Sequence, residues 1–182
     1  MTTFLRIAAA SAGVLVALSA QAQTEISRKD RFGQVMRVAL PAAAMAVGVY
    51  HDDMEGVRQL VFSTALAAGS TEVLKKLVRE ERPDGREKDS FPSGHAAVTF
   101  AAAGFVHQRY SLQWALPFYA LATATAYKRV HTHNHFTRDV VAGAAVGVLS
   151  SWAFTGRYTT PRSTASIGYF DKAVVLNYTH TW

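Results

Sequence analysis

Cations and histidines gather in three short segments of this chain, and long apolar stretches separate the segments. They cover residues 75–83 (KKLVREERP), 91–95 (FPSGH) and 128–139 (KRVHTHNHFTRD). Lysine and arginine hold phosphate oxygens, and histidine serves both as a nucleophile and as a proton carrier. Because the apolar stretches predict helices, we expect the three segments to meet at one end of a bundle and bind an anion there.

The middle segment has the composition of a helix start. Pro92 suits the first turn of a helix, and Ser93, Gly94 and His95 follow it. The unpaired N–H groups and partial positive charge of a helix N-terminus attract anions, and glycine lets a ligand approach the backbone closely. In an anion site, Ser93 would add a hydroxyl donor, Gly94 would admit the ligand close to the backbone, and His95 could donate a proton. The alternative is an ordinary helix start that carries a surface histidine.

The third segment combines a histidine, a carboxylate and an arginine. His135 and Asp139 are four residues apart, which places them on one face if the segment is helical. A carboxylate that accepts a hydrogen bond from one imidazole nitrogen leaves the other nitrogen available for attack. Arg129 lies six residues before His135 and can grip phosphate oxygens. Alternatively, Asp139 only stabilises a helix N-terminus.

The same segment contains the pattern H-x-H-x-H, formed by His131, His133 and His135. Histidines at this spacing bind a metal when the chain is extended. No acidic residue is interleaved, and cations flank the run, so we favour an anion site without metal.

In the first segment, Lys75 and Arg82 are seven residues apart, which is two turns along one face of a helix. Two cations on one face can contribute to an anion site, and a solvent-exposed basic stripe paired with Glu72, Glu80 and Glu81 is the alternative. For Lys76 and Arg79 a solvent-exposed basic stripe is the better interpretation.

The elements that must position these residues are helices. Five alanine-rich blocks are each long enough for three to five helical turns, at 35–50, 57–78, 94–108, 112–127 and 139–154. We expect an all-α bundle of five to six helices. The tail alternates with period two from Ala173, which predicts a short β-hairpin through Asp171–Lys172 or an extended tail.

Residues 1–22 have the layout of a secretory signal peptide, with Arg6 before an apolar core and a small-residue cleavage site at Ala22. An uncleaved first membrane helix is the alternative. We expect a polar leader at 23–34, a helical domain at 35–158 and an extended tail at 159–182.

Composition narrows the chemistry. The 182 residues include no cysteine, which excludes disulfides, iron–sulfur clusters and a thiol nucleophile. The formal net charge is +6, and the mean hydropathy of +0.06 lies between that of a soluble domain and that of a membrane protein. Export makes nucleic acid an improbable partner for the positive charge.

Taken together, the three segments resemble the signature of the type 2 phosphatidic acid phosphatase / vanadium haloperoxidase superfamily. The resemblance rests on the spacings Lys75-x6-Arg82-Pro83, PSGH at 92–95 and Arg129-x5-His135-x3-Asp139, and covers about residues 35–155. One departure is Lys128, which stands where the family usually has serine.

The resemblance implies metal-free phosphoryl transfer through a phosphohistidine. His135 would be the nucleophile, Asp139 its orienting partner and His95 the general acid and base. The remaining residues would hold the phosphate oxygens, namely Lys75, Arg82, Ser93, Gly94 and Arg129. No cofactor is implied, although vanadate is a candidate inhibitor or, less favoured, a cofactor.

The predicted function is a phosphoric monoester hydrolase acting on lipid phosphates or pyrophosphates at the periplasmic side. The chain would lie in the periplasm or the inner membrane, with a membrane as neighbour and a lipid or small phosphomonoester as substrate. The alternatives are a broad-specificity soluble periplasmic acid phosphatase, a vanadium-dependent haloperoxidase and a non-catalytic protein that binds anionic lipid. The sequence does not indicate an oligomeric state.

Overall fold

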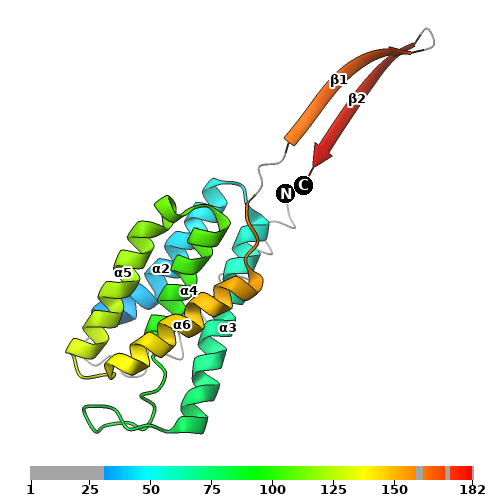
Figure 1. Cartoon of the computed structure of the whole chain (residues 1–182). Coiled ribbons are helices and arrows are strands. Elements are labelled where there is room, and N and C mark those ends of the chain that lie inside the picture. The colour runs from blue at the N-terminus through cyan, green and yellow to red at the C-terminus, as the bar shows by residue number, and fades with distance from the viewer. Residues whose placement is uncertain (1–30, 159–161, 171–172, 182) are drawn as a thin grey trace.

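Five helices and one hairpin make up the part of the chain that the structure describes. The computed structural model describes residues 31–158, 162–170 and 173–181, the last two ranges as backbone. The helices are α2 (Arg31–Tyr50), α3 (Met54–Val78), α4 (Gly94–Arg109), α5 (Leu112–His131) and α6 (Thr137–Phe154). They lie side by side as a bundle (Figure 1), which confirms the predicted all-α fold.

Helix α4 is the centre of the bundle. It packs against α2, α3, α5 and α6. From Gly94 to Val106 every residue except Phe100 is buried. The small side chains of this stretch let four helices approach it, and larger buried side chains such as Leu40, Leu60 and Phe105 fill the remaining core. Burial of each large apolar side chain contributes about 1.5–3 kcal/mol.

Glycines bring α6 unusually close to α4. A Cβ atom on Gly143 would overlap the carbonyl oxygen of Ser93, and one on Gly147 would overlap the carbonyl oxygen of Ala97. These two glycines lie one turn apart on the same face of α6. The close approach sets the start of α4 against the start of α6, where the second and third predicted segments lie.

A buried ion pair holds the opposite end of the bundle. Asp53 caps α3 by accepting from the Gly56 N–H at 2.8 Å. It also accepts from Arg109 Nε at 2.7 Å and Nη2 at 2.6 Å, and from the Tyr110 hydroxyl at 2.9 Å. Since removal of one partner from a buried pair costs about 3–5 kcal/mol, this contact stabilises the α3–α4 arrangement.

Two helix boundaries differ from the prediction in a way that affects the site. Helix α5 runs to His131, four residues beyond the predicted block, because Lys128 and Arg129 continue the helix. Helix α2 begins at Arg31, so the last four residues of the predicted polar leader, 31–34, are helical. The predicted signal peptide, residues 1–22, lies outside the described residues.

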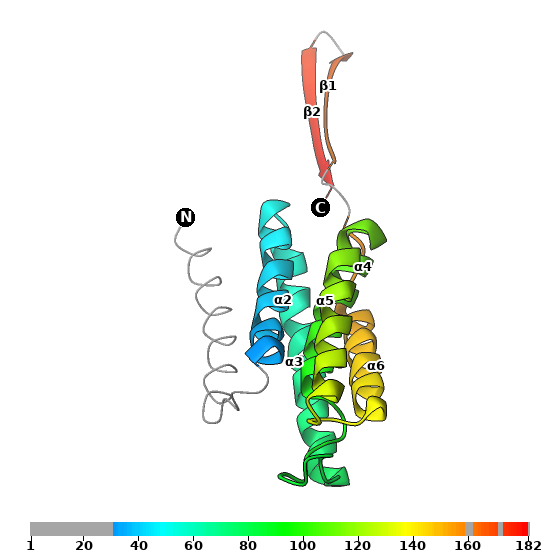
Figure 2. The same cartoon turned by 90° about the vertical axis from the view of Figure 1, so that its left-hand side faces the viewer.

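The tail forms the predicted hairpin. Strands β1 (Arg162–Phe170) and β2 (Ala173–Thr181) pair antiparallel, with Phe170 opposite Ala173 and Ile167 opposite Leu176. The hairpin extends beyond the bundle in both views (Figure 1, Figure 2). Just before it, Tyr158 returns to the bundle, where its N–H donates to the Arg109 carbonyl at 2.8 Å.

Candidate active site

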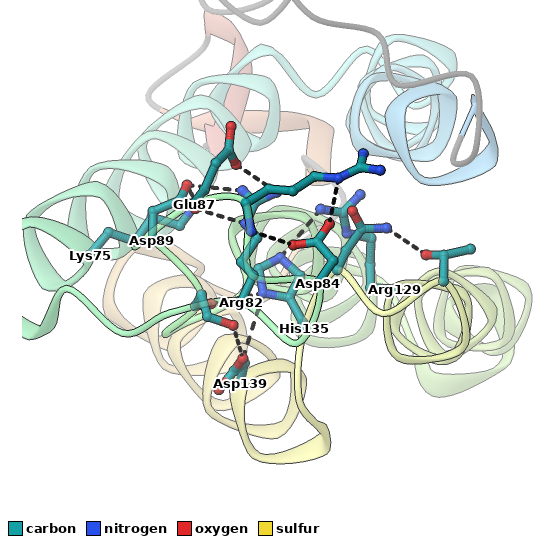
Figure 3. Close-up of polar contacts among 12 residues, drawn as sticks. Lys75, Arg82, Asp84, Glu87, Asp89, Arg129, His135 and Asp139 are labelled. Atoms are coloured by element: carbon teal, nitrogen blue, oxygen red, sulfur yellow. Dashed lines mark hydrogen bonds and ion pairs between the residues drawn. The ribbon is translucent and has the colours of Figure 1, made fainter.

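The three predicted segments meet at one end of the bundle. Helices α3 and α5 end there, and α4 and α6 begin there, so the loops 79–93 and 132–136 share the same end. Figure 3 shows the side chains of Lys75, Arg82, Arg129, His135 and Asp139 pointing into one region between these elements. The structure thus brings together residues that are up to 64 positions apart in the sequence.

The imidazole of His135 is buried and held at both nitrogens. Its Nδ1 lies 2.8 Å from the carbonyl oxygen of Ser90, and its Nε2 lies 3.4 Å from Nη2 of Arg129. A carbonyl only accepts, so Nδ1 must carry the proton, and a guanidinium only donates, so Nε2 must present its lone pair. Both partners therefore favour the same neutral tautomer, in which Nε2 is the nucleophilic atom.

The loop before α6 is shaped by the carbonyl of Arg129. That carbonyl accepts from the N–H groups of Asn134 at 3.1 Å and His135 at 3.2 Å. The turn folds His135 back beside the guanidinium of the same arginine. His131 and His133 are exposed, unlike His135. The structure therefore does not bring the H-x-H-x-H pattern together, and no cluster of three His, Cys, Asp or Glu side chains suited to a metal occurs within the described residues.

Asp139 approaches His135 indirectly. Its Oδ2 accepts from the Ser90 hydroxyl at 2.5 Å and from the Phe136 N–H at 2.9 Å. The distance from the same oxygen to His135 Nδ1 is 3.7 Å, which is longer than a hydrogen bond. His135 precedes α6, so the predicted shared helical face is wrong. The contact between the two side chains passes through Ser90.

The start of α4 supplies the second segment. Ser93 caps the helix, with its hydroxyl accepting from the Ala96 N–H, and Gly94 is the first helical residue. The N–H of Ser93 donates to the carbonyl of Asp139 at 2.9 Å, which links the starts of α4 and α6. His95 is buried, and its Nε2 has no hydrogen-bond partner in the described part of the chain.

The surroundings of both histidines favour their neutral forms near pH 7. Burial, followed by the positive charges of Arg129, Lys75 and Arg82, lowers the pKa of His135 to about 3, although the Ser90 carbonyl opposes this shift. Burial also lowers the pKa of His95 well below its ordinary value, together with the nearby charges of Arg129, Arg37, His135 and Lys75. An anion in the site would offset these charges and favour protonation of His95.

Lys75 and Arg82 meet through a carboxylate. Helix α3 ends at Val78, so Arg82 lies in the following loop, and the predicted placement of both cations on one helical face is wrong. Asp89 joins them. Its Oδ2 lies 3.4 Å from Lys75 Nζ and accepts from Arg82 Nη2 at 2.9 Å. The site end of the bundle thus holds the three predicted cations, as Figure 3 shows.

Comparison with known proteins identifies the family of this arrangement. A profile of the PAP2 superfamily matches residues 56–162, a range that contains all three segments. This chain belongs to the PAP2 superfamily. The resemblance inferred from the spacing of the motifs is therefore confirmed.

Relatives of this PAP2 protein include lipid phosphatases. The lipid A 4′-phosphatase of Helicobacter pylori is 31% identical over 144 residues, which cover 73% of this chain and 72% of that protein. The lipid A 1-phosphatase of Porphyromonas gingivalis is 36% identical over 88 residues, which cover 47% of this chain and 20% of that protein. The crystal structure of Aquifex aeolicus LpxE matches with a TM-score of 0.57 and 21% identity, over 71% of this chain and 87% of that one. That similarity shows a common fold.

Three further residues lie near the side chains of this site, and the motif spacing did not indicate them as site residues. Ser90 and Asp89 directly precede the FPSGH segment, and the run KDSFPSGH would have drawn attention to both. Arg37 is a cation on the otherwise apolar helix α2, and its charge acts on His95. It lies on the inward face of α2, between Gly33 and Leu40, which are both buried.

The arrangement of this PAP2 site suits phosphoryl transfer. A neutral imidazole with an oriented lone pair lies among three cations, beside a helix N-terminus. A phosphoryl transition state needs positioning and positive charge, and both are present here without a metal.

Proposed function

We propose that this protein hydrolyses the phosphate monoester of a lipid through a phosphohistidine formed on His135. The observation that carries the proposal is the position of His135, whose Nδ1 proton faces the Ser90 carbonyl and whose Nε2 faces Arg129. The enzyme class, a phosphoric monoester hydrolase of the PAP2 superfamily, agrees with the family match and the named relatives.

In the first step, Nε2 of His135 attacks phosphorus as the ester P–O bond breaks. The leaving alkoxide takes a proton from His95, which becomes protonated when the phosphate charge enters the site. The predicted cations Lys75, Arg82 and Arg129 hold the phosphate oxygens, and Ser93 and the N–H of Gly94 donate to them.

In the second step, water attacks the phosphohistidine and gives a proton to His95. The P–N bond breaks, the lone pair returns to Nε2 and inorganic phosphate leaves. Asp139 acts on His135 through Ser90, because its carboxylate accepts the Ser90 hydroxyl while the Ser90 carbonyl accepts the imidazole proton. No step requires a metal.

A lipid substrate is supported by the relatives and by the surface of the bundle. The named relatives act on lipid A. Helix α3 exposes Phe62, Leu66, Val73 and Leu77 at helical spacing, and Phe62 stacks on Phe154 of α6 with ring centroids 5.7 Å apart. Exposed apolar faces of this kind accommodate acyl chains.

The composition of α2 supports a place at a membrane. Among the described helices, α2 alone is long and apolar enough to cross a bilayer by length and composition. We propose that the chain is exported and membrane-associated, with its active site on the periplasmic side.

The decisive experiment is to trap the intermediate. Wild-type protein mixed with a radiolabelled phosphomonoester and quenched in alkali should retain label as phosphohistidine, whereas His135→Ala should retain none and lose all measurable turnover. His131→Ala is the matched control, because His131 is a nearby but exposed histidine. Equal turnover by His135→Ala and the control would refute the proposal.

Substrate class and metal dependence need separate assays. Hydrolysis of lipid A phosphate should exceed that of p-nitrophenyl phosphate in mixed micelles, and treatment with EDTA should leave both unchanged. Inactivation by EDTA that zinc reverses would instead favour a metal at the H-x-H-x-H pattern.

A further inference from the structure

The carboxylate of Asp89 pairs with Lys75 and Arg82, the two cations that would bind the substrate phosphate. Its Oδ2 accepts from Nη2 of Arg82 at 2.9 Å, and its Oδ1 forms an ion pair with Nε of the same guanidinium at 2.7 Å, without the alignment of a hydrogen bond. Oδ2 also lies 3.4 Å from Nζ of Lys75. Figure 3 shows Asp89 between the two cations.

Asp89 uses the edge of Arg82 that best fits a phosphate. The Nε and Nη2 edge of a guanidinium binds two oxygens of a carboxylate or a phosphate side by side. The remaining nitrogen, Nη1, lies 2.8 Å from Oε2 of Glu87. A phosphoryl group that reaches Arg82 in two-point fashion must therefore displace Asp89 from this edge.

The Asp89 side chain can leave Lys75 and Arg82, and its carboxylate stays negatively charged near neutral pH. The Asp89 side chain is 37% exposed, against 13% for Lys75, so it can turn toward water while the cations stay in place. Burial alone would raise the pKa of the Asp89 carboxyl, but Lys75 and Arg82 outweigh burial and hold the pKa below its ordinary value. Asp89 is therefore an anion at every pH near neutrality.

We propose that Asp89 is an internal anion that competes with the phosphate group for Lys75 and Arg82 and thereby sets the affinity of the site. The inference rests on the proposed function, because it assigns the two cations to the substrate phosphate. Asp89 holds the cations before the substrate arrives. It returns to them when inorganic phosphate leaves, which weakens product inhibition.

The test measures binding of inorganic phosphate and of vanadate to the intact protein by calorimetry at neutral pH. Asp89→Asn keeps the shape and one acceptor but removes the charge, and we expect both anions to bind about five- to tenfold more tightly. Asp89→Glu retains the charge and should bind them no more tightly than the wild type. A second neutral variant, Asp89→Ser, should repeat the result for Asn and covers the case in which Asn impairs folding.

Asp84→Asn is the matched control, since it removes one negative charge from the same loop. Asp84 contacts Arg86, with Oδ2 3.9 Å from Nε, and it contacts neither Lys75 nor Arg82 among the described contacts. If Asp84→Asn raised the affinity for phosphate and vanadate equally, the effect would come from net charge alone and the proposal would be overturned. Unchanged or weaker binding in both neutral Asp89 variants would also overturn it, and would make Asp89 a residue that positions the cations.

Turnover separates this inference from the proposed function. If wild-type protein fails to hydrolyse lipid phosphates but Asp89→Asn binds phosphate more tightly, the inference stands and the proposed reaction fails. If the wild type is active and Asp89→Asn neither binds phosphate more tightly nor lowers KM, only the inference fails.

Discussion

The Nδ1 atom of His135 lies 2.8 Å from the carbonyl oxygen of Ser90. The imidazole proton is thus held by the main chain, and substitution of a side chain does not remove its acceptor. The carboxylate of Asp139, at 3.7 Å, contributes through the Ser90 hydroxyl instead. This arrangement predicts that loss of the Ser90 hydroxyl or of the Asp139 carboxylate weakens catalysis without abolishing it.

Ser90→Ala should lower kcat about tenfold and leave KM nearly unchanged, since a hydrogen bond to a charged group such as the Asp139 carboxylate is worth about 1.5–3 kcal/mol. The variant keeps the backbone carbonyl but loses the hydroxyl that joins Ser90 to Asp139. Asp139→Asn should lower kcat by a similar factor, and the double variant should be no worse than either single one, because the two act as one unit.

Steady-state kinetics on p-nitrophenyl phosphate measure these factors. Ser90→Thr retains a hydroxyl and should restore most of the lost kcat, which a purely structural role would not predict. Fully additive losses in the double variant would contradict the coupling between the two residues.

Acid should destabilise the protein through the two buried histidines of the site, His95 and His135. The pKa of His135 is lowered to about 3 from an ordinary value of 6.5. Between these two pH values the unfolded chain therefore binds more protons than the folded protein. The contribution of His135 to stability is present above pH 6.5 and is lost as the pH drops toward 3. By this linkage, His135 alone accounts for a loss of about 2 kcal/mol at pH 5.

Urea unfolding at pH 7.5 and pH 5 measures this loss. His135→Gln should show a smaller difference between the two pH values, because its side chain does not titrate. Vanadate should also reduce the difference, by offsetting the surrounding cations. A pH dependence that is the same in His135→Gln and in the wild type would assign the titration to other groups.

The sequence predicted the composition of the site better than its local geometry. Helical periodicity and motif spacing indicated which segments meet, and all eight predicted residues lie at the same end of the bundle. The spacing of Lys75 and Arg82 suggested one continuous helix, but α3 ends at Val78 with Arg79 in a left-handed conformation, at φ 50°. The cations are joined across the loop by Asp89, which is a tertiary contact without a periodic signal.

The predicted pairing of His135 with Asp139 failed in detail for a similar reason. A spacing of four residues implies contact only inside a helix, whereas His135 lies in the turn before α6. The actual acceptor is a backbone carbonyl 45 residues earlier. Backbone acceptors are common to all residues, so sequence identity carries no signal for this contact.

The glycine contact between α4 and α6 predicts that Gly143→Ala is disruptive. The added Cβ would overlap the Ser93 carbonyl and push the start of α4 away from α6. We expect a loss of stability of about 1–3 kcal/mol, typical of overpacking, and a loss of kcat larger than this implies, because Ser93 and His95 shift relative to His135.

Gly69→Ala is the control for this substitution. Gly69 lies within α3, and a Cβ there would meet nothing within 4 Å. It should raise stability by about 0.5–1 kcal/mol through helix propensity and leave kcat unchanged. Thermal unfolding and kinetics on both variants measure the contrast, and an active, stable Gly143→Ala would show that the two helices separate without consequence.

We expect Arg37, on helix α2, to contribute to substrate binding. The positive charge of Arg37 lowers the pKa of His95, so it acts on the same site as the predicted cations. Arg37→Gln should therefore raise KM for a phosphomonoester about three- to tenfold, in keeping with the loss of one charge contact.

Arg37→Lys should recover most of this affinity, and Arg31→Gln is the control, because Arg31 lies on the same helix but is exposed. A KM equal to that of the wild type in Arg37→Gln would place Arg37 outside the binding site.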